Sequence, residues 1–148
     1  MAKICVQSKD FDTAHETALI SADRHDIGAI VNFIGLVRDF DDKSLKSMTL
    51  EHYPAMTALE LERIAGEAEK RWPLQGLTII HRYGELFPGD QIVLVVAASA
   101  HRDAAFQAAS YVMDFLKTRA PFWKKEETGD KSEWVEAKDS DDDATERW

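Results

Sequence analysis

The chain contains a single cysteine, Cys5, among its 148 residues. One cysteine excludes an intramolecular disulfide and any cysteine-clustered zinc or iron–sulfur site, and it fits a reducing cytoplasm. Cys5 lies in the short apolar segment from Lys3 to Val6. A small hydrophobic side chain in a strand is therefore expected there, rather than a reactive thiol.

Long apolar runs and an excess of positive charge are also missing. No stretch approaches the roughly 18 uninterrupted apolar residues of a membrane span, and no basic start followed by an apolar run marks a secretion signal. Acidic residues outnumber basic ones by 27 to 18, a net charge of -9. This balance argues against a general affinity for nucleic acid or an anionic membrane. We expect a soluble, unprocessed protein with protein and small-molecule partners.

The common catalytic signatures are absent. The sequence has no HExxH, GxSxG or C-x-x-C motif, no glycine-rich phosphate or dinucleotide loop, and no paired ligand spacing among its five histidines. We therefore expect no metal site and no bound cofactor.

Acidic residues gather at the C-terminus. Residues 126–148 hold ten acids and three bases, whereas the rest of the chain is nearly neutral. At 45% hydrophobic residues, the chain is large enough to bury one core without disulfide or metal support. We predict one domain over residues 1–138, followed by an acidic tail over residues 139–148.

Three helices are predicted. Asp12 suits the N-cap of a helix from Thr13 to Ser21. Thr57 and Glu60 form a capping-box pattern ahead of an apolar helical face that runs to about Arg71. Ser99 is the expected cap of the third helix, and Pro121 ends it, because the residue before proline disfavours the helical conformation.

Strands are predicted over residues 3–6, 29–34, 48–53, 77–83, 91–98, 122–127 and 134–137. The second and third of these are expected to pair. Pro88 and Gly89 predict a type II turn that joins 77–83 and 91–98 into a hairpin. Residues 91–98 are apolar on both faces, which indicates a central strand. Hairpins interrupt the alternation of strands and helices, so the fold class is α+β rather than a doubly wound parallel sheet.

Two lysines form the first cationic group. Lys117 lies in the last turn of the third helix and Lys124 on the strand beyond Pro121. Strand alternation places Lys124 on the face of Phe122 and Lys125 on the opposite face, so Lys124 is the natural companion of Lys117. The bland alternative is that Lys117 only complements the helix C-terminus, worth about 0.3–1 kcal/mol, and that Lys124 decorates a solvent edge. The pattern alone leaves both interpretations open.

The other cationic candidates are weaker. His101 and Arg102 begin the third helix, where free backbone N–H groups and a guanidinium could bind an anion, although an exposed basic pair explains them as well. Arg38 follows the second strand and is an ordinary surface charge unless the junction aims it into a cleft. His52 and His81 lie in strands, where half-buried, hydrogen-bonded imidazoles are expected.

Seven segments, in order from Gly28 to Ala137, together resemble one family, the large subunit of molybdopterin synthase. They are GAIVNFIGLVRD, LEHYPAM, RWPL, IIHRYGELFPGD, ASAHRDAAF, MDFLKTRAPFWKKE and WVEA. The resemblance implies an α+β fold of the α/β-hammerhead kind. It also implies a homodimer of large subunits within a heterotetramer, with a small ubiquitin-like sulfur carrier at each end.

The resemblance further implies a sulfurtransferase without a cofactor. The carrier's C-terminal Gly-Gly thiocarboxylate delivers one sulfur at a time to cyclic pyranopterin monophosphate, and two deliveries build the molybdopterin dithiolene. Lys117 and Lys124 match the family's essential lysines, and Arg38, His101 and Arg102 match residues that line its anion pocket. We expect Lys117 to act as the acid/base or charge-stabilising group and Lys124 to position the thiocarboxylate.

Two departures from the family pattern stand out. The loop of residues 39–47 has no glycine, and residues 141–143 are unusually acidic. Two other functions remain as alternatives. One is a phosphate-ester hydrolase that uses the same cations, and the other is a non-catalytic binding module for a ubiquitin-like protein.

Overall fold

The computed structural model describes residues 2–135 and 143–148. The helices are α1 (Thr13–Ser21), α2 (Pro54–Arg71) and α3 (Arg102–Thr118). The strands are β1 (Lys3–Gln7), β2 (Ala29–Leu36), β3 (Ser47–His52), β4 (Leu74–Arg82), β5 (Gly84–Leu86), β6 (Gln91–Ser99), β7 (Phe122–Glu127) and β8 (Ser132–Val135). This α+β arrangement confirms the predicted fold class.

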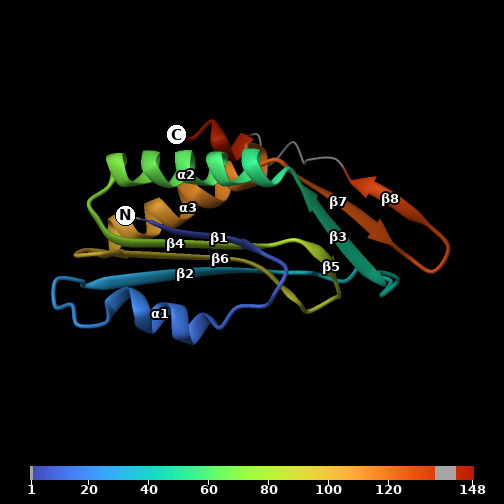
Figure 1. The fold of residues 1–148 in the computed structure, drawn as a ribbon, viewed down its shortest axis with the longest axis horizontal. Coiled ribbons are helices and arrows are strands. Elements are labelled where there is room, and N and C mark those ends of the chain that lie inside the picture. Colours follow the sequence, from blue (N-terminus) through green and yellow to red (C-terminus); the bar gives the residue numbers. More distant parts are fainter. Residues whose placement is uncertain (1, 136–142) are drawn as a thin grey trace.

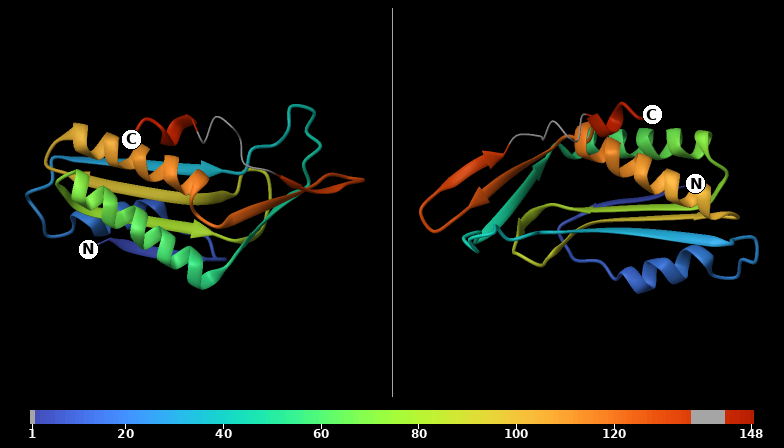
Figure 2. Two further views of the ribbon diagram at one scale, coloured as in Figure 1. Left: turned by 90° about the horizontal axis from the view of Figure 1, so that it is seen from above. Right: turned by 180° about the vertical axis from the view of Figure 1, so that it is seen from behind.

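The strands form two four-stranded sheets. The first has the order β1-β4-β6-β2 and the second the order β5-β3-β7-β8. In the first sheet β1 runs parallel to β4, while β4, β6 and β2 pair antiparallel. Helices α2 and α3 cover one face of this sheet and α1 covers the other (Figure 1). The second sheet extends away from one end of the first (Figure 2).

The core is built around β6, which is buried from Val93 to Ser99. Val93 and Val95 point to the helices α2 and α3, where they join the largest apolar cluster. Leu94 and Val96 point to the α1 side and pack with Phe11 and Ile80. The two-sided apolar pattern of this segment is thus explained, and the predicted central strand is confirmed. Each fully buried side chain of this kind contributes about 1.5–3 kcal/mol.

Several local predictions are confirmed. The Asp12 carboxylate accepts a hydrogen bond from the His15 amide at 3.0 Å and caps α1. In the hairpin of β4 and β6, the Asp90 amide donates to the Phe87 carbonyl at 2.9 Å and Gly89 adopts φ +92°, as a type II turn requires. Strand β7 spans the predicted residues, and α3 ends before Pro121.

The predicted pairing of residues 29–34 with 48–53 is wrong. Strand β2 pairs with β6 in the first sheet, whereas β3 lies between β5 and β7 in the second. The reason is that β6, a central strand, has backbone hydrogen-bonding groups along both of its edges, and each edge needs a partner strand. One edge pairs with β4 through the hairpin, and the apolar strand β2 takes the other, so the loop after β2 carries the chain into the second sheet.

The predicted caps of the two long helices are also wrong. Helix α2 begins at Pro54, and the N–H that proline lacks would have no acceptor within the helix in the first turn. Thr57 belongs to the helix, and its side chain is buried. Ser99 ends β6, and its hydroxyl donates to the Pro73 carbonyl at 3.0 Å. The N-cap position of α3 is His101, which makes no side-chain capping bond.

The C-terminal end returns to the helices. The predicted domain boundary at residue 138 and the end of the predicted strand 134–137 lie outside the described residues. Trp148 packs edge-on against Trp72 and Tyr111, at ring distances of 5.5 and 5.6 Å. Its indole N–H donates to the Asp114 carboxylate at 2.6 Å. Over residues 2–135 and 143–148, no helix combines the length and apolar character needed to cross a membrane.

Gly28 and Gly66 provide a matched pair for testing this packing. The Gly28 amide donates to the Ser99 carbonyl at 3.0 Å, and a Cβ at Gly28 would overlap the backbone carbonyl oxygen of Ala100. We expect Gly28→Ala to lower the free energy of unfolding by about 1–3 kcal/mol. Gly66 has open space around its Cα in the middle of α2, so Gly66→Ala should raise stability by about 0.5–1 kcal/mol. Chemical denaturation measures both values, and equal midpoints for the two variants would contradict the packing described.

Candidate functional site

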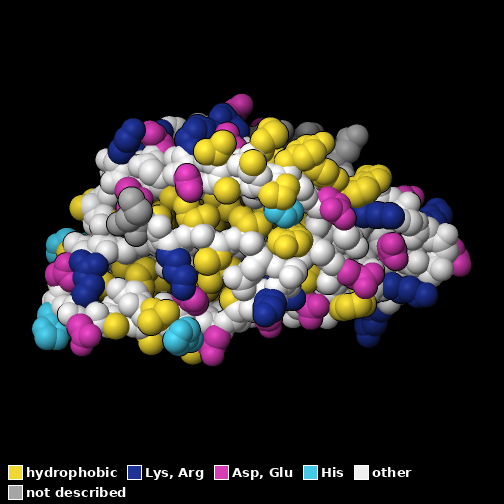
Figure 3. Space-filling view, viewed as in Figure 1, with side chains coloured by type: hydrophobic (Ala, Val, Ile, Leu, Met, Phe, Trp, Pro, Cys, Tyr) yellow, Lys and Arg dark blue, Asp and Glu magenta, His cyan; other side chains and the backbone are white. Residues whose placement is uncertain are grey.

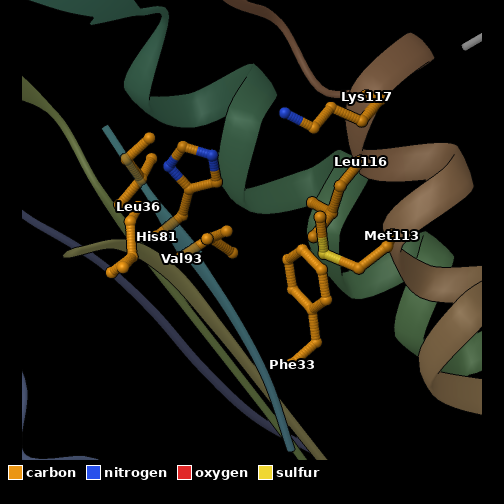
Figure 4. A pocket seen from close by; sticks show the side chains of 9 residues that line it. Phe33, Leu36, His81, Val93, Met113, Leu116 and Lys117 are labelled. Atoms are coloured by element: carbon orange, nitrogen blue, oxygen red, sulfur yellow. The ribbon is translucent and has the colours of Figure 1, made fainter. Parts of the chain in front are cut away.

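A cavity of about 80 Å³ opens between the first sheet and the C-terminal end of α3 (Figure 4). Its lining comes from β2, β4, β6 and α3. The lining residues are Phe33, Gly35, Leu36, His81, Ile92, Val93, Met113, Leu116 and Lys117. All of them are apolar except His81 and Lys117. Lys117 is therefore the one basic side chain in the lining, and its ammonium group extends over the cavity.

The sequence of α3 explains why Lys117 lies at this border. Leu116 is buried, at 6% exposure, on the face that packs against the sheet. The next residue, Lys117, is exposed in the last turn, where the helix passes the edge of the sheet. A lysine here also complements the partial negative charge of the helix C-terminus. The structural and the functional interpretations of Lys117 are thus compatible.

His81 lies opposite Lys117 and is 9% exposed. Its Nδ1 is 2.8 Å from the carbonyl oxygen of Arg82. Because a carbonyl oxygen can only accept, Nδ1 carries the hydrogen and Nε2 bears the lone pair. Burial lowers the pKa of His81 to about 4, and the nearby Lys117 and His52 act in the same direction, although the Arg82 carbonyl opposes them. The imidazole is therefore neutral near pH 7.

Phe122 connects His81 to Lys124. The His81 and Phe122 rings stack at 3.8 Å with an angle of 15° between their planes. Lys124 follows Phe122 on the same face of β7, and its cross-strand partner in β3 is the buried Leu50. Lys125 faces the other way, with its Nζ 5.8 Å from the ring centre of Trp134. Lys124 thus lies on the second sheet, two residues beyond the ring that covers His81, and outside the cavity lining.

The remaining predicted site residues lie elsewhere in one chain. The Arg38 side chain is 82% exposed and pairs with Asp41 at 3.7 Å. His101 and Arg102 are exposed at the start of α3. Arg102 is separated from Lys117 by nearly the whole helix, which corresponds to about 22 Å at 1.5 Å per residue. Of the five predicted site residues, Lys117 lines the cavity, whereas Lys124, Arg38, His101 and Arg102 lie outside its lining.

The glycine-free loop after Arg38 is held by its own carboxylates. Asp39 accepts hydrogen bonds from the amides of Phe40 at 2.7 Å and Leu45 at 3.2 Å. Asp42 accepts from the amide and the hydroxyl of Ser44. Lys43 takes the left-handed conformation, with φ +59°, that glycine would favour. The acidic residues of this loop thus have a structural role.

Sequence reasoning placed His81 in a strand as a buried, hydrogen-bonded imidazole, which the structure confirms. It did not predict that His81 lies in the Lys117 cavity. The turn at Pro88 and Gly89 gave no usable signal, because a regular hairpin closed there would pair His81 with Val96. Strand β5 leaves the hairpin to pair with β3, and His81 pairs with Val93. Phe33 and Met113 were also missed, because nothing in an apolar periodicity distinguishes cavity lining from core.

A second, wider hollow of about 340 Å³ lies between β1, β3 and the start of α2. Its lining contains Glu62 and His52 but no lysine or arginine, so it does not suit an anionic substrate. Apolar side chains gather beside it at the start of α2 (Figure 3). Tyr53, Met56 and Leu59 are 57%, 57% and 66% exposed there. Such a surface is suited to contact with another protein rather than to chemistry.

Comparisons with known proteins agree with this architecture. The family model described as MoaE protein matches residues 6–119. The molybdopterin synthase catalytic subunit of Mesorhizobium japonicum is 58% identical over 145 residues, which cover 97% of this chain and 91% of that protein. The corresponding subunit of Escherichia coli is 50% identical over 147 residues, with 99% and 97% covered.

Solved structures show the same similarity. The molybdopterin biosynthesis MoaE protein from Burkholderia ambifaria has a TM-score of 0.86 and 49% identity, with 100% of this chain and 98% of that one covered. Molybdopterin synthase from Staphylococcus aureus has a TM-score of 0.81 and 29% identity, with 88% and 95% covered. Since the family model and these relatives together span nearly the whole sequence, the chain belongs to the MoaE protein family.

Proposed function

We propose that this chain is the catalytic subunit of a molybdopterin synthase. It receives sulfur from the thiocarboxylated Gly-Gly end of a small ubiquitin-like carrier and transfers two sulfurs to cyclic pyranopterin monophosphate. The observation that carries this proposal is the narrow apolar cavity with Lys117 at its mouth. The single cysteine fits work in the reducing cytoplasm.

The size of the cavity favours the end of the carrier as its occupant. At about 80 Å³, it is well below the roughly 300–1,000 Å³ of sites that enclose a small molecule. A Gly-Gly end has no side chains and can enter a narrow, mostly apolar opening. The ammonium of Lys117 attracts the anionic thiocarboxylate, and the apolar lining strengthens this attraction for the part of the group that enters the cavity.

The two lysines suit the chemistry at the pterin. Opening a cyclic phosphate and expelling oxygen from carbon both build negative charge, which a fixed cation stabilises. Lys117 can also donate a proton to the departing oxygen. Lys124 approaches from the second sheet and holds the thiocarboxylate or the intermediate in place.

A second copy of the chain supplies the cations that one chain holds too far away. Strand β2 is an edge strand of the first sheet, and its Phe33, Ile34 and Leu36 are 40%, 39% and 54% exposed. An edge with exposed apolar residues on both faces favours pairing with another strand. We infer that two copies meet there about a two-fold axis near the middle of β2.

The geometry of β2 explains what this pairing achieves. Leu36, at one end of the strand, lines the Lys117 cavity, and Ala29, at the other end, pairs with Ser99 just before His101. A two-fold axis between these ends sets each end beside the opposite end of the partner. His101 and Arg102 of one copy would then reach the Lys117 cavity of the other and bind the substrate phosphate. Arg38, two residues beyond Leu36, would lie at the same junction.

The lysines on the two faces of β7 test the catalytic assignment. We expect Lys117→Ala to lower the rate of dithiolene formation about 10²–10³-fold, the usual effect of removing one stabilising group. Lys124→Ala should also lose activity, whereas Lys125→Ala, on the opposite face, should keep it. The assay combines each variant with thiocarboxylated carrier and cyclic pyranopterin monophosphate.

Normal dithiolene formation by Lys117→Ala would refute the assignment. Carrier binding, followed by size-exclusion chromatography, should survive in all three variants. If the unaltered chain bound the carrier but formed no dithiolene, the chain would be a binding module. Phosphate release that does not require the carrier would instead favour the hydrolase.

Mixing two inactive variants tests the two-chain site. Lys117→Ala and Arg102→Ala chains that exchange subunits form mixed dimers in which one of the two sites has both residues. We expect such a mixture to recover about a quarter of the unaltered activity on random exchange. A site within one chain would recover none, because every site would lack one of the two residues.

A further inference from the structure

We propose that His81 is a positioning residue that presents a neutral nitrogen acceptor to the ammonium group of Lys117. The inference rests on the proposed function and adds a residue to its site. His81 comes from β4, in the middle of the first sheet, whereas Lys117 comes from the helix above it. Both line the same cavity.

The orientation of the His81 ring is fixed. Phe122 covers one side of the ring at 3.8 Å, and the Nδ1–H donates to the Arg82 carbonyl at 2.8 Å. Turning the ring over would replace this bond with a C–H group beside a carbonyl, which costs about 1–3 kcal/mol in a buried place. Nε2 therefore keeps one direction. Figure 4 shows this nitrogen on the side of the ring that faces Lys117.

The neutrality of His81 determines what it does to Lys117. A carboxylate at this position would hold the lysine protonated and would repel an anionic substrate group. An imidazolium would repel the ammonium. A neutral acceptor can accept one N–H of the ammonium and direct the group without cancelling its positive charge. The burial of the ring and its low pKa of about 4 keep it neutral down to mildly acidic pH.

The surroundings of His81 support the same state. Among the residues that the structure describes, Lys117 on α3 and His52 on β3 are the titratable side chains that act on the ring, and both disfavour its protonation. Its other neighbours, Phe122 on β7 and Val93 on β6, carry no charge. Among the described residues around the cavity, no carboxylate belongs to the lining. The described part of the cavity lining thus presents a neutral acceptor on the side of Lys117.

Two substitutions separate positioning from packing. His81→Phe keeps an aromatic ring against Phe122 and removes the acceptor, whereas His81→Gln keeps an acceptor and removes the ring. We expect His81→Phe to lower kcat for dithiolene formation about 10–100-fold, since a misplaced catalytic group costs up to about 10²-fold. KM for the pterin should change less than about twofold, and His81→Gln should recover most of kcat. Equal kcat for His81→Phe and the unaltered chain, or a greater loss in His81→Gln than in His81→Phe, would overturn the proposal.

A second measurement needs no His81 variant. The ring ¹⁵N resonances of His81 should report a neutral Nδ1–H tautomer at pH 7, and Lys117→Met should move the Nε2 resonance. An Nε2–H tautomer, or an Nε2 resonance that does not respond to Lys117→Met, would overturn the proposal even if the His81 variants failed to fold. Failure of the proposed function is distinguishable, because it would appear as no dithiolene formation by the unaltered chain.

Discussion

The two sheets meet where the ring of His81 lies on the ring of Phe122, 3.8 Å apart. Strand β4 carries His81 within the first sheet, and Phe122 begins β7 of the second sheet. This stack fixes the position of β7 against the end of α3, because only Arg119 to Pro121 separate the two elements. The distance between Lys117 and Lys124 thus depends on an aromatic contact that neither lysine makes.

Sequence patterns predicted the elements whose signals are local. Asp12 caps α1, the turn at Gly89 closes the β4–β6 hairpin, and β7 has the predicted span, because each follows from neighbouring residues. Partner choice was not local. Strand β2 pairs with β6 instead of the next strand in sequence, since β6 needed a second apolar neighbour. Thr57 and Ser99 match the sequence patterns of helix caps, but both side chains are buried. Burial depends on contacts between distant segments, which a local cap pattern does not contain.

The candidate site shows the same division. Alternation on β7 correctly separated Lys124 from Lys125, because register with β3 places Lys124 opposite the buried Leu50. The place of His81 in the cavity lining could not be predicted, since a histidine in an apolar strand has the same sequence pattern in a core and in a cavity wall. His101 and Arg102 were grouped with Lys117 by resemblance. Only the length of α3 shows that one chain keeps them about 22 Å from it.

The distance between Lys117 and Arg102, together with the placement of β2, favours a two-fold symmetric dimer. Helix α3 and strand β2 each connect the Lys117 cavity at one end to the His101 region at the other. Gly28 holds the second end tightly, because its amide bonds the Ser99 carbonyl and its bare Cα lies against Ala100. A rigid element with unlike ends cannot bring them together by bending. A two-fold axis through its middle can, because it sets each end beside its unlike counterpart in the second copy. Under the proposed function, the substrate's anionic groups would then be bound across a subunit boundary, and the cavity for the carrier's end would lie within one chain.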